Sequence, residues 1–224
     1  MKILAIDTTT KKAEVTLLKD NDLNTYKEEN EITHSEKLLP LIDKMLKDNN
    51  ISLKEIDCIA CTVGPGSFTG VRIAIATVKA LTYVLNTPIF SMNTLELMAR
   101  SVEITTNSKY ILSVLDAKNN RAYYALYNSE NFEVLIDCKN KDIEDMLKEI
   151  ENLGINMHEV LVVSNNKEFL NLHFADTDIA VVDISTEKLC KCVDLEDNVH
   201  ITDCMKLDAI YARVSQAQRQ KYGE

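Results

Sequence analysis

The chain of 224 residues has the length of one large domain or two small ones, and either can bury a sizeable core. Its 46% hydrophobic and 27% charged residues are typical of a globular protein and exclude a disordered chain. The formal net charge of −10 argues against strong nucleic-acid binding by this chain alone, because phosphate neutralisation needs a basic footprint.

The cellular location is predicted from what the sequence lacks. No apolar run reaches the roughly 18–20 residues that cross a bilayer. The first ten residues lack the long apolar segment and the cleavage site of a signal peptide. We therefore expect a cytoplasmic protein that contacts no membrane, with its six cysteines present as reduced thiols.

The first half of the chain is predicted to begin with a β-hairpin and to continue as alternating helices and strands. Pro40 falls within the first of these helices and is expected to kink it near its first turns. On the same helix, one apolar face is predicted to contain Leu38, Leu39, Ile42, Met45 and Leu46. The predicted elements are strands over 2–6, 13–18 and 23–27, a helix over 33–46, a strand over 56–63, a helix over 70–85, a strand over 88–91 and a helix over 93–100.

The second half repeats this plan, because it also opens with two strands joined by a short turn. Its predicted elements are strands over 110–115, 121–127 and 132–138, a helix over 142–152, strands over 159–164 and 179–183 with a short helix between them, and helices over 186–194 and within 211–222. The duplication predicts an α/β protein with the actin-like ATPase (ASKHA, ribonuclease H-like) fold, built from two tandem mixed-sheet domains. We place these domains at 1–106 and 107–224, with the final helix able to return to the N-terminal domain. The pattern alone fits a generic α/β fold equally well.

Three of the five glycines lie in the segment GPGSFTG at 64–70, between a strand and a helix. This geometry favours anion binding, although the segment has neither the Walker lysine nor the GxGxxG spacing. A tight turn packed against a neighbouring backbone is the alternative. Asp7 and the threonines after it resemble the phosphate or metal loop of actin-like ATPases, so Asp7, Thr8 and Gly66 are the candidates for a cofactor site. Asp116 occupies the equivalent place in the second half, where a turn-forming role is the alternative.

The helix over 70–85 is apolar nearly all round, which is typical of a helix covered on more than one side. Gly70 with Ala74, and Ala76 with Ala80, place small side chains four residues apart, so that another helix can approach closely. Two interpretations stay open. The helix is either a central core element or a helix that packs on its own sheet with one face and on a partner protein with another.

Five blocks of sequence, taken together and in order, resemble the TsaB (YeaZ-like) family. They span almost the whole chain: MKILAIDTTT at its start, THSEKLLPLIDKML at 33–46, GPGSFTGVRIAIATVKAL at 64–81, DAKNNRAYYALY at 116–127 and IYARVSQAQRQ at 210–220.

The resemblance implies an accessory role. TsaB proteins are paralogues of TsaD, the catalytic subunit that transfers threonylcarbamoyl from its adenylate to the tRNA adenosine beside the anticodon. TsaB supports TsaD, together with the ATPase TsaE, and forms homodimers when the partner is absent. It contacts tRNA only indirectly, and it has no cofactor of its own, since ATP or ADP and the metal are expected on TsaD and TsaE. Its first two long helices contact TsaD, which makes the interface candidates His34, Leu38, Ile42, Met45, Gly70, Arg72, Ile73, Ala76 and Ala80.

No catalytic residue and no metal site are expected in this chain. TsaD-like proteins hold a metal with paired histidines, and Thr94 and Met98 stand at the matching places here. Glu96 alone does not make a site. His34 fits a helix cap with Ser35 and Glu36 better than acid–base chemistry. The alternative function is a glycoprotease-like metallopeptidase or an actin-like ATPase that acts alone.

The cysteines offer no convincing zinc or redox motif. Cys58 and Cys61 form a CxxC within a predicted strand, where their side chains would point to opposite faces. The spacing of Cys190, Cys192, His200 and Cys204 matches no zinc pattern.

Overall fold

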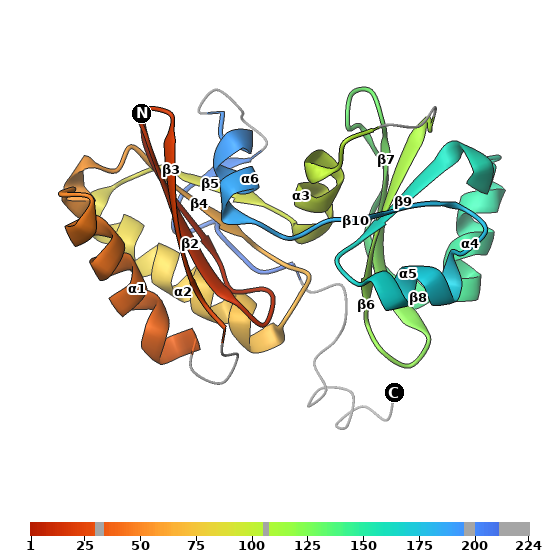
Figure 1. The fold of residues 1–224 in the computed structure, drawn as a ribbon, viewed down its shortest axis with the longest axis horizontal. Helices are drawn as coiled ribbons and strands as arrows, with labels where there is room; N and C mark the ends of the chain where they lie inside the picture. Colours follow the sequence, from red (N-terminus) through yellow and green to blue (C-terminus); the bar gives the residue numbers. More distant parts are fainter. Residues whose placement is uncertain (30–33, 105–107, 195–199, 211–224) are drawn as a thin grey trace. The chain divides into compact units, whose positions relative to one another are not determined.

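The computed structural model describes residues 1–29, 34–104, 108–194 and 200–210. The described residues form two compact units (Figure 1). The first contains residues 1–97 and 184–210, and the second contains residues 98–183. Each unit has its own mixed β-sheet.

The first unit is a six-stranded sheet with the order β11-β5-β4-β1-β2-β3. Helices α1 and α2 cover one face of this sheet, and α6 lies on the other (Figure 1). Its elements are β1 (Lys2–Asp7), β2 (Ala13–Lys19), β3 (Asp22–Glu28), α1 (His34–Asp48), a 3-10 turn (Leu53–Glu55), β4 (Cys58–Thr62), α2 (Phe68–Leu85), β5 (Ile89–Met92), the start of α3 (Thr94–Ser101), α6 (Thr186–Cys192) and β11 (Ile201–Thr202).

The register of the central strands brings two strand ends together. β1 pairs antiparallel with β2 and parallel with β4, with Ile6 opposite Cys61. Because β1 and β4 are parallel, their carboxyl ends meet at one edge, where α/β proteins commonly position functional groups. Asp7 at the end of β1 therefore lies next to Thr62 at the end of β4.

The core of the first unit lies between the sheet and the inner faces of α1 and α2. Helix α1 contributes one apolar stripe, which consists of Leu38, Leu41, Ile42, Met45 and Leu46. Leu39 was predicted on this face, but its side chain is 53% exposed, and Leu41 takes the predicted place. Successive residues on a helix point about 100° apart, and this rotation places Leu39 beyond the edge of the stripe that the five buried residues form. Pro40 lies inside α1, and the helix continues beyond it.

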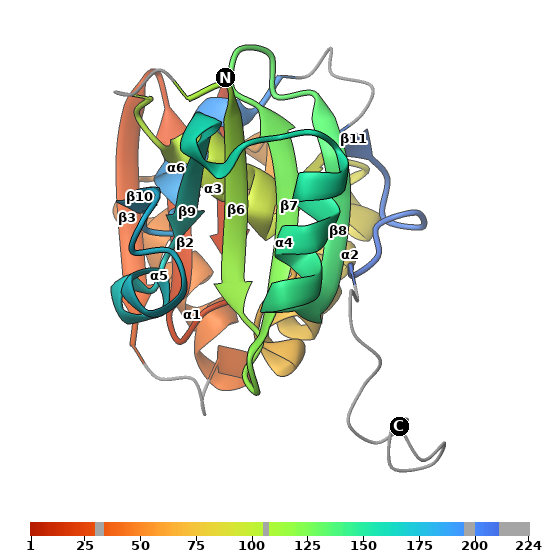
Figure 2. The same ribbon diagram turned by 90° about the vertical axis from the view of Figure 1, so that its right-hand side faces the viewer.

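The second unit has a five-stranded sheet with the order β10-β9-β6-β7-β8, and α4 and α5 cover one of its faces (Figure 2). Counted in chain order within each unit, the first five strands of both units follow the same order, 5-4-1-2-3. This duplication confirms the predicted actin-like class of fold. The elements are β6 (Tyr110–Asp116), β7 (Arg121–Asn128), β8 (Val134–Asp142), α4 (Ile143–Asn152), a 3-10 turn (Met157–Glu159), β9 (Val160–Ser164), α5 (Lys167–His173) and β10 (Asp178–Val181).

The division of the chain differs from the predicted domains 1–106 and 107–224. The first boundary falls within α3, and residues 184–210 return to the first unit. Two contacts explain the return. Glu14 Oε1 accepts hydrogen bonds from the amide (2.8 Å) and hydroxyl (2.9 Å) of Thr186, at the start of α6. Ile201 in β11 pairs with Phe90 in β5. The final helix predicted within 211–222 lies outside the described residues.

Candidate functional site

The carboxylate of Asp7 is enclosed by donors from its own chain. Its side chain is 2% exposed and accepts hydrogen bonds from the amide (3.2 Å) and hydroxyl (2.8 Å) of Thr9. The hydroxyl of Thr62 donates a third, short hydrogen bond. Burial raises the pKa of Asp7 to about 6, and the hydrogen bonds from Thr62 and Thr9 limit the rise. This carboxylate is therefore engaged in holding the strand ends together.

The glycine-rich loop packs directly against the turn that follows β1. The amide of Ser67 donates to the carbonyl of Thr9 (2.7 Å), and the hydroxyl of Thr8 donates to the carbonyl of Gly70 (2.6 Å). A Cβ atom at Gly66 would lie 2.5 Å from Thr9 O, and one at Gly70 would lie 1.8 Å from Thr8 O. Close backbone approach thus requires glycine at both positions, which is the tight-turn alternative considered for this loop.

The three candidates for a cofactor site come together in this closed junction. Thr8 is fully buried and donates to Gly70, so its hydroxyl serves the junction. Gly66 is the exposed member of the three. Ser67 then caps α2, because its hydroxyl oxygen accepts from the amide of Gly70 (3.2 Å). The arrangement fixes the position at which the 18-residue helix α2 begins.

The equivalent aspartate of the second unit has a different role. Asp116 ends β6. Its carboxylate accepts a hydrogen bond from the amide of Lys118 (2.7 Å) and forms an ion pair with the ammonium group of the same lysine (2.6 Å). Asp116 therefore closes its own turn, as the turn-forming interpretation predicted.

Neither of the two positions on α3 that the sequence analysis considered for a metal-binding histidine pair holds a histidine. Thr94 and Met98 on α3 are both fully buried. Glu96, which lies between them, has its carboxylate 3.0 Å from Nε2 of His200. The ring of His200 also stacks on Phe90, with 5.2 Å between ring centroids. Glu96 and His200 thus form a buried pair that fastens the segment before β11 to the first unit.

The two cysteines of β4 lie on opposite faces of the sheet, and burial raises the pKa of their thiols. Cys61 belongs to the core beneath α1 and α2, whereas Cys58 lies outside that cluster, in agreement with the predicted opposite faces. Burial raises the pKa of Cys58 to about 11, and that of Cys61 and of Cys190 to about 12. Within the described ranges, no three His, Cys, Asp or Glu side chains gather as a set of metal ligands.

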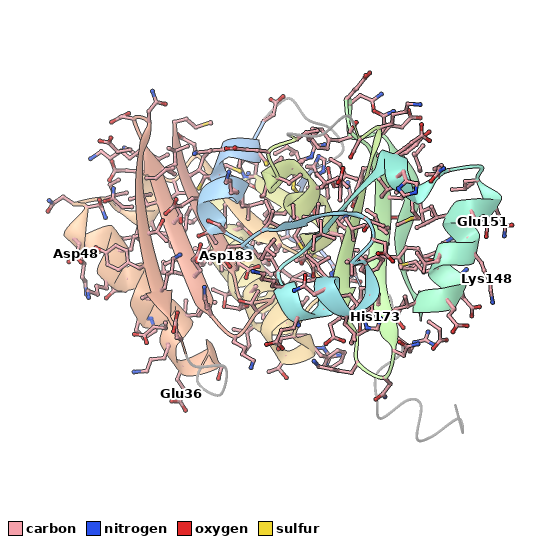
Figure 3. The ribbon with its side chains drawn as sticks, turned by 45° about the vertical axis from the view of Figure 1, so that its right-hand side comes forward. Glu36, Asp48, Lys148, Glu151, His173 and Asp183 are labelled. Atoms are coloured by element: carbon pink, nitrogen blue, oxygen red, sulfur yellow. The ribbon has the colours of Figure 1, made fainter. Side chains whose placement is uncertain are left out.

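A polar cleft in the second unit lies where α4 meets strands β7 and β8, and its lining charges neutralise one another. Arg121 pairs with Asp142 (2.8 Å), and Lys141 pairs with Glu149 (2.7 Å). Lys148, labelled on α4 in Figure 3, approaches Asp145 at 3.8 Å. The cleft therefore lacks the excess of positive charge that a nucleic-acid site requires.

Helix α2 has two apolar faces, and the first unit covers one of them. The covered face contains Gly70, Val71, Ala74, Ile75, Val78 and Thr82. The opposite stripe is exposed and consists of Thr69, Arg72, Ala76, Ala80, Tyr83 and Val84. Tyr83 is 75% exposed and Val84 is 81% exposed, with the small residues Ala76 and Ala80 between them and Arg72. We call this stripe the outer face of α2.

Hydropathy alone does not identify what covers the outer face. By length and composition, α2 is the one described helix that would fit a membrane span, although no run of this kind was expected from the sequence. A third of its residues are buried inside the first unit, against β4 and β1. One side of the helix therefore belongs to the core of the first unit, and the other side is exposed.

The structure narrows the predicted interface. Leu38, Ile42, Met45 and Gly70 are buried in the first unit, so the prediction that they form a contact surface is corrected: the sheet of this chain already uses them. Arg72, Ala76 and Ala80 are exposed and Ile73 is half-buried. His34 begins α1, and its side chain lies outside the description. The sequence analysis did not mark Tyr83 and Val84, which continue the exposed stripe of Ala76 and Ala80.

The outer face of α1 offers a contrast, because it is charged. Glu36 and Asp48 mark its two ends in Figure 3, and both side chains are exposed. Lys47 pairs with Asp43 on the same face (2.6 Å). The exposed apolar stripe of the helix pair therefore belongs to α2.

The duplicated sheet order and the sealed loop define a two-unit α/β protein of the actin-like class. A solved Pseudomonas aeruginosa protein similar to the peptidase YeaZ shares this fold, with a TM-score of 0.76 over 95% of this chain and 99% of that chain at 21% identity. YeaZ from the same organism gives a TM-score of 0.74, covering 94% of this chain and 99% of that chain at 21% identity.

Sequence comparison identifies the family. A family model described as TsaD, tRNA N6-adenosine threonylcarbamoyltransferase, matches residues 26–210. The tRNA threonylcarbamoyladenosine biosynthesis protein TsaB of Buchnera aphidicola subsp. Schizaphis graminum is 34% identical over 161 residues, which cover 68% of this chain and 76% of that protein. TsaB of Escherichia coli K12 is 34% identical over 130 residues, 58% of this chain and 56% of that protein. The chain belongs to the TsaB (YeaZ-like) family.

Proposed function

We propose that this chain is a non-catalytic subunit that supports a TsaD-type transferase, together with TsaE. The complex transfers threonylcarbamoyl from threonylcarbamoyl-AMP to the tRNA adenosine next to the anticodon. This chain carries no cofactor of its own, while ATP or ADP and a metal belong to TsaD and TsaE. It works in the cytoplasm and contacts tRNA only through the complex.

The observation that carries this proposal is the outer face of α2. Fully burying one large apolar side chain yields about 1.5–3 kcal/mol, so an exposed row that includes Tyr83 and Val84 gains free energy from a partner. Ala76 and Ala80 leave room for a helix to approach closely between these larger residues. A protein helix is therefore the partner element that fits this face.

The polar groups support an accessory role over independent chemistry. The acceptors of Asp7 are occupied by Thr9 and Thr62, and Glu96 is paired with His200. Both carboxylates are buried. Among the residues that the structure describes, no set of metal ligands supports the rival metallopeptidase. Calorimetric titration with ATP and magnesium is expected to give no binding to the isolated chain, and micromolar binding with hydrolysis would contradict the proposal.

Reconstitution with TsaD, TsaE, tRNA and threonylcarbamoyl-AMP tests the proposed role. Omitting this chain is expected to abolish modified adenosine, measured by mass spectrometry of digested tRNA. Ala76→Phe is expected to prevent assembly with TsaD and to reduce product to the level of the omission arm, because the ring blocks helix approach.

The matched control places the same side chain on an exposed helix of the second unit, as Asn171→Phe on α5. This variant is expected to retain assembly and product, and both variants should keep the thermal midpoint of the wild type. Full activity of Ala76→Phe, or full activity without this chain, would contradict the proposal.

In the absence of TsaD, a second copy of the chain is proposed to cover the same face. Sedimentation analysis is expected to show a dimer for the wild type and for Asn171→Phe, and a monomer for Ala76→Phe. A dimer that persists in Ala76→Phe would place the contact between copies elsewhere.

A further inference from the structure

Helix α2 differs in charge from the chain to which it belongs. The chain has a net charge of −10, yet α2 contains two charged residues, and both are cations, Arg72 and Lys79. No acidic residue falls between Phe68 and Leu85. The neighbouring helix α1, in contrast, carries charges of both signs on its exposed side. Helix α2 therefore cannot neutralise its two cations by ion pairs along its own length.

The two cations differ in their surroundings. The guanidinium group of Arg72 is already engaged, since its central carbon lies 3.9 Å from the centroid of the Phe68 ring, within the range of a cation–π contact. The ammonium group of half-buried Lys79, in contrast, has no carboxylate at ion-pair distance and no hydrogen-bond acceptor among the residues that the structure describes. Lys79 is therefore the cation of α2 whose counter-charge a partner can supply.

Lys79 borders the outer face of α2. Ala76 lies three residues before it and Tyr83 four residues after it, and side chains at these spacings are neighbours on a helix. A partner that covers Ala76 and Tyr83 also removes water from the ammonium group beside them. Because an ammonium group that loses water without gaining an acceptor costs free energy, the covering surface needs an acceptor at this position.

We infer that the TsaD surface that covers α2 presents a carboxylate to Lys79, and that this ion pair selects TsaD over a second copy of the chain. This inference rests on the proposed function and adds the chemistry by which the partner is chosen. In a two-fold dimer the same surface of both copies meets, so the outer face of α2 would meet a helix with two cations and no acidic residue. A carboxylate on TsaD supplies an attraction that the second copy lacks.

The surroundings of Lys79 favour a protein carboxylate over an RNA phosphate. RNA binding gains its affinity from several cations that neutralise successive phosphates. The outer face of α2 instead places the exposed apolar side chains of Tyr83 and Val84 near its lysine, and tyrosine is enriched in protein interfaces. Water is excluded when such a surface is covered, which strengthens an ion pair at its border.

The experiment compares two reactions of one variant, binding to purified TsaD by biolayer interferometry and self-association by sedimentation analysis. Lys79→Met removes the charge and keeps an unbranched side chain that suits a helix. It is expected to raise the Kd for TsaD about fivefold or more, because the carboxylate of TsaD is left without a partner. The same variant is expected to self-associate at least as tightly as the wild type, because it removes one cation from each side of the dimer.

The matched control is Lys188→Met, at an exposed position of α6 on the opposite face of the sheet. Each replacement removes one positive charge, which takes the net charge from −10 to −11. Lys188→Met is expected to change the Kd for TsaD by less than about twofold. Both variants should keep the thermal midpoint within about 2 °C, since neither lysine belongs to the buried core of the first unit.

Neutralising carboxylates in the partner completes the test. Exposed Asp and Glu residues of TsaD are changed one at a time to Asn and Gln, and one such change is expected to weaken binding of the wild type without weakening binding of Lys79→Met. Failure of every such change would overturn the inference.

The remaining outcomes separate this inference from the proposed function. Equal TsaD affinity of wild type and Lys79→Met, or an equal loss of TsaD binding and of self-association, would overturn the inference while leaving the proposed function intact. Absence of any TsaD binding by the wild type would instead refute the proposed function. Loss of tRNA cross-linking in Lys79→Met with unchanged TsaD affinity would assign Lys79 to RNA and overturn the inference.

Discussion

The two units share one sheet order but finish their first strand in different ways. In the first unit, Asp7 is buried among three hydroxyl and amide donors, and a glycine-rich loop seals the turn that follows it. In the second unit, Asp116 closes an exposed turn by itself. The common topology fixes where these aspartates stand, while their neighbours decide whether the strand end becomes a packed junction.

The helices that follow the fourth strand of each unit also differ, in length and in the surface they expose. The sealed junction of the first unit leads into α2, with 18 residues and an exposed apolar face. The corresponding helix of the second unit, α5, has seven residues and begins after an asparagine cap. The two units thus share one sheet order, but the helix after the fourth strand is long and partly exposed in the first unit and short in the second.

The largest expected effect is on the junction itself. In Gly70→Ala the new Cβ would stand 1.8 Å from the carbonyl oxygen of Thr8, so the backbone must move. We expect a loss of at least about 3 kcal/mol in the free energy of unfolding, measured by urea denaturation. Gly154→Ala in the second unit is the matched control, since its Cβ would meet nothing within 4 Å. Its positive φ of 74° alone should cost about 1 kcal/mol. Equal losses in the two variants would show that the junction is not tightly packed.

A second, smaller effect distinguishes the two aspartates by pH. Burial raises the pKa of Asp7 to about 6, so its proton is retained in the folded state over a range where the unfolded chain has released it. The associated stabilisation is complete below about pH 4 and is lost as the pH rises through 6. Asp7→Asn removes this dependence.

The stability of Asp7→Asn relative to the wild type should therefore increase by up to about 3 kcal/mol between pH 4 and pH 7, as followed by urea denaturation at each pH. Asp116→Asn keeps an oxygen that can accept from the amide of Lys118 and should change stability by less than about 0.5 kcal/mol at both pH values. A constant difference between wild type and Asp7→Asn across this range would rule out the raised pKa.

The smallest expected effect concerns the second unit, where the pKa of a carboxylate is lowered and stability therefore changes with pH in the opposite direction. Burial alone would raise the pKa of Glu149, but hydrogen bonds from Lys139, Lys141 and Tyr124 lower it to about 2. Its contribution is therefore present at neutral pH and is lost as the pH falls toward 2. Glu149→Gln should cost about 1–2 kcal/mol at pH 7 in urea denaturation and progressively less below pH 4. A cost that increases on acidification would contradict this assignment.

Much of the local structure follows from patterns within short segments. Two short strand-like runs separated by a polar turn predict the hairpin of β1 and β2, and the 3.6-residue period of apolar residues predicts α1. The error at Leu39 has a local cause, since the helical rotation places this residue just beyond the edge of the buried stripe of α1. The error in the domain boundary has a distant cause. Residues 184–210 belong to the first unit because α6 and β11 contact β1, β2 and β5.

The candidate site shows the same division between local and distant causes. The sequence alone marked Asp7, the glycine-rich loop and the small residues of α2, since unusual residue types at fixed spacing can be recognised without coordinates. Only the tertiary structure decided that Asp7 is enclosed, because Thr62 lies 55 residues away and reaches it through the parallel pairing of β1 and β4. The tertiary structure likewise decided which face of α2 is covered. An apolar side chain specifies that it is better buried, but the packing of the whole unit determines which side chains it has room to bury.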